Sequence, residues 1–155
     1  MLRGESCEQR PVQRHVPLHI GGTGPTTLAL AAEIADTVGL AGPGRDRLAE
    51  HVDRQIGWIR GAAQAANRTP EIQLLLHTVA VLPHRFAAEE IVAARLPELS
   101  TQEARQSPYV LVGSQGDIAE KLFAVQSRWG ISHFTIRFEA MTAFAPVLAR
   151  LRDQN

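Results

Sequence analysis

Cysteine is almost absent from this chain of 155 residues, in which Cys7 is the only one. A single cysteine excludes a disulfide within the chain and a thiolate metal cluster. A reducing cytoplasm therefore suits the chain best, and we expect a cytoplasmic location. Because Cys7 lies in a polar segment, we interpret it as an incidental exposed thiol rather than a nucleophile.

The chain also lacks an excess of charge of either sign. Sixteen Lys and Arg residues balance sixteen Asp and Glu residues, and the formal net charge is +0. Because nucleic-acid binding proteins usually carry a basic excess or stripe, we expect no nucleic-acid partner. No apolar run approaches the roughly 20 residues of a membrane-spanning helix. The polar start of the chain has no apolar signal-peptide core, so we expect no membrane partner and no secretion.

Motifs for metal or serine chemistry are missing as well. No two histidines have the spacing of a zinc pair on one helix, and no carboxylate pair completes a facial triad. No Gly-x-Ser-x-Gly nucleophile elbow occurs. We expect His19 and His77 to be structural, hydrogen-bonded side chains. The sequence therefore predicts no metal site and leaves the catalytic acid and base unknown.

What remains is the composition of one globular domain, with 45% hydrophobic and 21% charged residues. We divide the chain into a polar leader (residues 1–16), a domain (17–152) and a short tail (153–155). Strand and helix signals alternate through the domain, which predicts a parallel α/β fold. The predicted strands are Leu18–Ile20, Asp36–Leu40, Ile72–Leu82 and Ile131–Phe138.

Helices are predicted between these strands from apolar residues that recur at three- and four-residue steps. We expect helices over Pro25 to about Ala35, over Arg45–Ala66, after the N-cap Ser114 with Asp117 in a capping box, and at the chain end. Residues 84 to about 104 look helical but are broken by Pro97. The expected buried stripes are Leu28, Ala31, Ala32 and Ala35; Leu48, Val52, Ile56, Ile59 and Ala63; Ile118, Leu122, Val125 and Trp129; and Met141, Phe144, Ala145, Leu148 and Leu151.

Two versions of a parallel α/β fold compete. A flavodoxin-like, doubly wound sheet of five strands suits 155 residues, and its first turn also holds a flavin phosphate. Part of a (β/α)8 TIM barrel is the other version, because a whole barrel needs about 250 residues. The first version requires a full central strand at Tyr109–Val112. The second requires only a short extended approach to Ser114.

The turn after the first strand is the main candidate for a binding site. Its residues Gly21, Gly22, Thr23, Gly24 and Thr26 connect a strand to a helix that has Pro25 in its first turn. Backbone N–H groups and the positive end of the helix dipole would meet an anion there, and a Thr hydroxyl would add a donor. The alternative is a tight turn in which Thr23 merely caps the helix. Capping alone explains Gly113 and Ser114 at a later helix.

Three blocks of sequence resemble the luciferase-like flavin- or deazaflavin-dependent oxidoreductases. The first is Pro-Val-Gln-x-x-x-Pro-Leu-x-Ile-Gly-Gly-x-Gly-Pro followed by Leu28-Ala29-Leu30-Ala31-Ala32-Glu33-Ile34-Ala35-Asp36. The second is Tyr109-Val110-Leu111-Val112-Gly113-Ser114 with the later Trp129-Gly130-Ile131-Ser132-His133-Phe134. The last is Phe144-Ala145-Pro146-Val147-Leu148-Ala149-Arg150-Leu151. The blocks occur in the family's order and match its C-terminal half.

This resemblance implies the C-terminal half of a luciferase-like TIM barrel. It implies an oxidoreductase or monooxygenase segment whose glycine turn binds the phosphate of coenzyme F-420, a deazaflavin, or alternatively of FMN. The reaction would be hydride transfer, or flavin-dependent oxygen chemistry, on a small organic substrate. On the last strand His133, Thr135 and Arg137 share one parity, and Phe134, Ile136 and Phe138 the other. If the apolar parity packs on helices, Arg137 faces the catalytic rim and contacts the substrate or the cofactor tail, unless a salt bridge holds it.

A half-barrel would leave two unpaired sheet edges and, we expect, an apolar inner face. The chain would then associate as a homodimer or with a complementing barrel half. It is also compatible with a non-catalytic half-barrel that only dimerises or binds cofactor, or with a flavodoxin-like electron carrier. The fragment alone would be inactive if the absent half supplies the catalytic groups.

Overall fold

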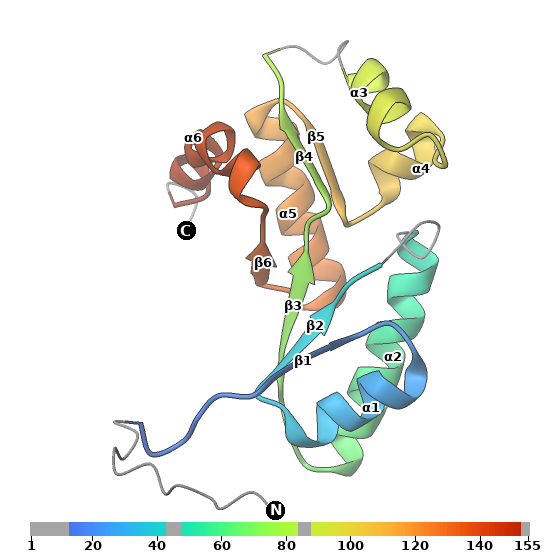
Figure 1. Cartoon of the computed structure of the whole chain (residues 1–155), viewed down its shortest axis with the longest axis vertical. Helices are drawn as coiled ribbons and strands as arrows, with labels where there is room; N and C mark the ends of the chain where they lie inside the picture. Colours follow the sequence, from blue (N-terminus) through green and yellow to red (C-terminus); the bar gives the residue numbers. More distant parts are fainter. Residues whose placement is uncertain (1–12, 43–47, 84–87, 153–155) are drawn as a thin grey trace, which may run out of the picture.

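Four parallel strands lie side by side in chain order, β1-β2-β3-β6, and two further strands, β4 and β5, form a separate parallel pair (Figure 1). The computed structural model describes residues 13–42, 48–83 and 88–152. Cys7, most of the leader and the tail lie outside these residues. The strands are β1 (His19–Gly22), β2 (Thr37–Leu40), β3 (Glu71–Leu75), β4 (Thr78–Val81), β5 (Val110–Gly113) and β6 (His133–Thr135). The helices are α1 (Pro25–Ile34), α2 (Ala49–Ala65), α3 (Ala88–Arg95), α4 (Thr101–Gln106), α5 (Gln115–Trp129) and α6 (Met141–Arg152).

The order of the strands identifies the architecture. Each crossover that joins neighbouring strands of the larger sheet contains at least one helix, and the order never reverses. Doubly wound sheets reverse their strand order at a switch point, whereas barrels place strands in sequence. Within the described part of the chain, β5 pairs with β4 alone and is not central. The flavodoxin-like alternative is therefore wrong, and the fold is part of a (β/α)8 barrel.

The core lies between the sheet and its helices. Even-numbered strand residues such as Val38, Leu40 and Leu74 are fully buried there. The predicted buried stripes of α1 and α5 are confirmed, because every residue named in them is buried. The second helix begins at Ala49, later than predicted, and residues 45–47 lie outside the described part. The predicted interruption of the helix at Pro97 is also confirmed, since α3 ends at Arg95 and α4 begins at Thr101.

The predicted strand Ile72–Leu82 is in fact two strands with different partners. The N–H of Leu76 donates to the carbonyl of Thr135, the last residue of β6, whereas the N–H of His77 donates to the carbonyl of Tyr109, just before β5. The chain continues in one direction from β3 into β4 (Figure 1). Apolar residues on both parities identified an extended segment, but they could not show that its neighbours change within it.

The last strand and helix also differ from prediction. The strand β6 contains only His133–Thr135, and Phe138 begins a 3-10 helix in which it is 81% exposed. Phe144 and Val147 are the buried residues of α6, and Met141, Ala145 and Leu148 are exposed. The predicted stripe on α6 is therefore confirmed at Phe144 and, in part, at Leu151, which packs against the core, and is wrong at Met141, Ala145 and Leu148.

The face of the sheet opposite the helices is polar, not apolar as predicted. Register places its residues in rows across the four strands, and we call this surface the inner face. Its side chains are mostly polar, and several are exposed. The interior of a whole TIM barrel is instead filled mainly by bulky branched side chains. The inner face comprises His19, Gly21, Thr37, Gly39, Glu71, Gln73, Leu75, His133 and Thr135.

Candidate functional site at the turn between β1 and α1

The predicted turn residues lie together where β1 ends and α1 begins. The strand ends at Gly22, and the helix starts at Pro25 with Gly24 as its N-cap. The alternative in which Thr23 caps the helix is therefore wrong. Since a Gly24 cap has no side chain, the amides of the first helical turn receive no side-chain hydrogen bond from the cap residue.

Two glycines of the turn have different surroundings. A Cβ on Gly22 would lie 2.7 Å from the Cγ2 atom of Thr27 and 3.1 Å from its Cβ, so a larger residue there would have to displace the Thr27 side chain. A Cβ on Gly24 would meet nothing within 4 Å. The backbone of Gly24 (φ −93°, ψ 159°) is open to most residues, so neither strain nor packing demands glycine there. The space beside Gly24 is large enough to admit a ligand atom.

The peptide between Thr23 and Gly24 is held by a buried side chain from α2. The Nε2 atom of Gln55 donates to the carbonyl oxygen of Thr23 at 3.1 Å, and Gln55 is fully buried. In a planar trans peptide the C=O and the following N–H point in opposite directions. Because the Thr23 carbonyl points toward the buried amide, the Gly24 N–H points away from the core.

The next donors come from the first turn of α1. Pro25 has no N–H, and the N–H of Leu28 is the first to return to the turn, bonding to the carbonyl of Gly24. No protein acceptor for the N–H groups of Thr26 and Thr27 is found among the described residues. The turn thus presents donors from Gly24, Thr26 and Thr27 at the positive end of a ten-residue helix. Such a set fits a phosphate without any metal ion.

Arg137 lies apart from this turn. It follows the end of β6, which forms the edge of the sheet opposite β1. It lines a cavity of about 290 Å³ together with Arg95, His77 and Glu139. The C-terminal ends of the strands form the face where barrel enzymes place their active sites. Arg137 follows the end of β6, and its contact with a substrate or cofactor tail stays a prediction. Phe134 and Ile136 pack toward helices. Phe138 does not.

A row of polar residues crosses the inner face below the rim. Gln73 is buried, and its Nε2 donates to the hydroxyl oxygen of Thr135. A Cβ on Gly39 would lie 2.5 Å from Nε2 of His19 and 3.0 Å from Oε1 of Gln73, so both side chains extend over this glycine. Sequence reasoning missed Gln73 and Gly39. The alternation within the strands could have revealed them, because both share the parity of His19.

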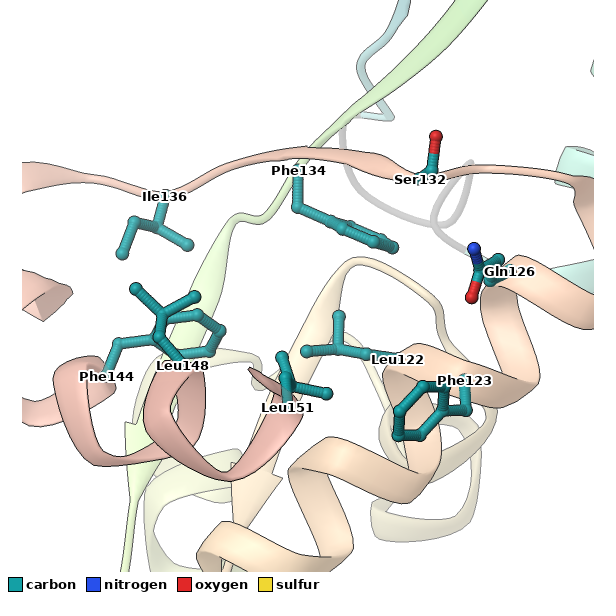
Figure 2. A pocket seen from close by; sticks show the side chains of 9 residues that line it. All are labelled: Leu122, Phe123, Gln126, Ser132, Phe134, Ile136, Phe144, Leu148 and Leu151. Carbon is teal, nitrogen blue, oxygen red and sulfur yellow. The ribbon is translucent and has the colours of Figure 1, made fainter. Parts of the chain in front are cut away.

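An apolar cavity of about 380 Å³ lies on the other face of β6, outside the barrel interior. Ile136 projects toward α6, Phe134 projects into the cavity toward α5, and Gln126 and Ser132 lie at one end (Figure 2). Because the strand separates this cavity from the inner face, it does not belong to the site at the glycine turn. Its remaining lining residues are Leu122, Phe123, Phe144, Leu148 and Leu151.

Charged groups elsewhere hold the elements in place. Burial lowers the pKa of Lys121 from 10.5 to about 8, and its Nζ donates to the carbonyls of Ala104, Arg105 and Val110. Burial opposes ionisation of Asp53, but hydrogen bonds from Trp129 and Arg128 outweigh it and lower the pKa of Asp53.

Asp36, the last residue of the first resemblance block, has a structural role. Its carboxylate accepts hydrogen bonds from the Leu18 N–H at 2.7 Å and from His15 at 2.8 Å. These two bonds, in that order, lower the pKa of Asp36, with a smaller contribution from Arg68. The carboxylate therefore fixes the segment that leads into β1 and places the glycine turn.

The described residues form neither a metal site nor a membrane-spanning helix. No group of three or more His, Cys, Asp and Glu side chains is placed to hold a metal ion among them. None of the described helices has both the length and the apolar character needed to cross a bilayer.

Solved structures of similar fold come from flavin- and deazaflavin-related proteins. An F420-dependent secondary alcohol dehydrogenase, in complex with an F420-acetone adduct, is 16% identical with a TM-score of 0.59, over 83% of this chain and 44% of its own. The long-chain alkane monooxygenase LadA is 15% identical with a TM-score of 0.61, over 88% and 41%. Flavoprotein 390 is 19% identical with a TM-score of 0.63, over 90% and 64%. No protein-family model matches the chain, and no curated protein matches it.

These structural neighbours define the class of fold. Their luciferase-like fold is that of the family which the three sequence blocks resemble. The chain has the fold of part of a luciferase-like TIM barrel. It spans between 41% and 64% of the length of these three proteins.

Proposed function

We propose that this chain is the cofactor-phosphate half of a luciferase-like oxidoreductase. The turn Gly21–Gly24 and Thr26 binds the phosphate of a deazaflavin or flavin cofactor. The observation that carries the proposal is the Gly24 N–H, which faces away from the core beside open space because Gln55 holds the Thr23 carbonyl. The amides of Thr26 and Thr27 extend the same donor set.

The cofactor, when bound, supplies hydride transfer or activation of oxygen, and the protein supplies position. The turn would anchor the phosphate just after the C-terminal end of β1, at the face where barrel enzymes place their active sites. Arg137 then offers a guanidinium to an anionic group of the substrate or of the cofactor tail. Its cavity also contains Glu139, which limits how strongly an anion is attracted there.

The neighbours include proteins described as F420-dependent and as flavoproteins, so both cofactors are candidates for this chain. We place coenzyme F-420 first, because the resemblance in Ser107-Pro108-Tyr109 and Arg128-Trp129-Gly130-Ile131 is greatest to the deazaflavin branch. A small organic molecule is the proposed substrate, and the cytoplasm is the proposed location.

A second half-barrel is the proposed partner. Among the described residues, β1 pairs only with β2 and β6 only with β3, so each has a free edge. Four further strands would close a barrel of eight. A homodimer or a complementing barrel half would provide them.

Titration of the purified chain with cofactor tests the proposal. Fluorescence quenching by FMN and by coenzyme F-420 is measured beside riboflavin, which has the flavin ring without the phosphate. We expect FMN to bind roughly tenfold or more tightly than riboflavin, since a hydrogen bond to a charged group contributes about 1.5–3 kcal/mol. Equal affinity for FMN and riboflavin, with no binding of coenzyme F-420, would contradict it.

A further inference from the structure

One residue of the apolar face of α2 is polar. Gln55 is fully buried, yet its neighbours on that face are Val52, Ile56 and Ile59. Burying a primary amide costs free energy unless its groups are hydrogen-bonded. An apolar side chain of similar length would fill the space without that cost. The amide therefore has a role other than packing.

The two ends of the amide contact different elements. Its Nε2 donates to the Thr23 carbonyl at 3.1 Å, and its Oε1 accepts from the Tyr109 hydroxyl at 3.4 Å. Tyr109 is also fully buried and precedes β5. The Thr23 carbonyl can only accept, so it orients the amide with Nε2 toward the turn, and the Tyr109 hydroxyl then holds the Oε1 end by donating to it. Tyr109 thus acts on the turn through Gln55.

Thr23 would lose its buried donor if Gln55 could not donate. Its carbonyl would then gain more by turning toward water, since an unpaired buried C=O is costly. Rotation of the peptide would carry the Gly24 N–H toward the core. The flanking Gly22 and Gly24 lower the barrier to such a change, because glycine tolerates most backbone conformations.

We propose that Gln55 is a positioning residue that keeps the Gly24 amide directed at the cofactor phosphate, with Tyr109 anchoring the other end of the Gln55 amide. This inference rests on the proposed function. Gln55 and Tyr109 would together produce the preference of the turn for a phosphorylated cofactor over the same ring without a phosphate. The bond to Thr23 crosses 32 residues of sequence and the bond to Tyr109 crosses 54.

The test compares variants that change the donor while they keep the volume. Gln55→Glu replaces the donor by an oxygen that repels the Thr23 carbonyl, and Gln55→Met removes both polar ends. Tyr109→Phe removes only the hydroxyl. Gln64→Glu is the matched control, because Gln64 is exposed on the same helix. The readout is the ratio of the dissociation constant for riboflavin to that for FMN, together with the urea midpoint of each variant.

We expect the ratio to fall from roughly tenfold in the wild type to about one in Gln55→Glu and Gln55→Met. We expect Tyr109→Phe to lie between, and Gln64→Glu to match the wild type. A merely structural role would lower the urea midpoint and leave the ratio unchanged, and that result would overturn the inference. If Gln55→Glu fails to fold, the ratios of dissociation constants in Gln55→Met and Tyr109→Phe test the inference. A wild-type ratio of one would instead contradict the phosphate site itself, and the role of Gln55 with it.

Discussion

Individual glycines in the candidate turn are present for different reasons, and this difference is visible in substitutions. Gly22→Ala forces a methyl group against Thr27, so we expect the free energy of unfolding to fall by about 1–3 kcal/mol. Gly24→Ala meets no atom of the protein and keeps an allowed backbone, so the loss of stability should be smaller. Its methyl group would occupy space beside the exposed amide and reduce the preference for FMN over riboflavin.

Urea denaturation and fluorescence titration of both alanine variants check this prediction. The expected pattern is one variant impaired in stability and the other in phosphate preference. If Gly24→Ala kept the full preference for FMN, the open space beside Gly24 would have no part in binding.

Lys121 gives a prediction about pH. Its pKa is about 8 in the folded protein and 10.5 ordinarily, so between these values the unfolded chain binds more protons than the folded one. The free energy of unfolding should therefore rise with pH across this window. Lys121→Met, which cannot titrate, should lack that part of the rise. Urea denaturation from pH 7.5 to 10 measures both slopes. Equal slopes would mean that the carbonyls of Ala104, Arg105 and Val110 hold the ammonium charged.

At the scale of elements, the caps are the features most readily tested. Ser114 forms a capping box with Asp117 at the start of α5, since each side chain bonds the other residue's backbone N–H. Ser114→Ala should lower the free energy of unfolding by about 1 kcal/mol. Ser127→Ala, an exposed serine on the same helix, is the control. Equal urea midpoints for the two variants would contradict a stabilising cap.

Local signals predicted the elements well and their partners poorly. The stripe from Ile118 to Trp129 and the Ser114 cap depend on neighbours within four residues, which a sequence displays directly. The change of partner at Leu76 and His77 depends on strands far away in the chain, which no local pattern encodes.

Within the candidate site the same limit applies. The turn itself could be predicted, because glycine, threonine and proline stand next to each other. Gln55 gave no signal, since a glutamine on a helix usually lies in water, and only tertiary packing buries it. Arg137 was placed near the rim by strand parity, but its neighbour Arg95 comes from a distant helix.

At the scale of the whole molecule, the polar inner face changes the reason for association. Little apolar surface is exposed on the inner face. Association would therefore depend on the free edges of the sheet and on a few exposed apolar residues outside it. Phe138 and Met141, which are 81% and 55% exposed, follow β6, and Leu18, which is 43% exposed, precedes β1. Both free edges of the sheet thus have apolar residues next to them.

We therefore expect a solution mass of twice the 16.9 kDa of one chain at micromolar concentration, if a second copy closes the barrel. Phe138→Ser should shift the mass toward one chain without lowering the melting temperature, because this side chain makes few contacts within the chain. Light scattering coupled to size exclusion measures both. A monomer at every concentration would exclude the homodimer and leave a separate complementing half as the partner.

The central claim, that backbone amides of the first turn bind the cofactor phosphate, is tested most directly by amide chemical shifts. The ¹⁵N-labelled chain is titrated with FMN and, separately, with riboflavin. We predict that the Gly24, Thr26 and Thr27 amide protons move downfield with FMN and remain in place with riboflavin. Unchanged shifts at these three amides in FMN-saturated protein would contradict the claim.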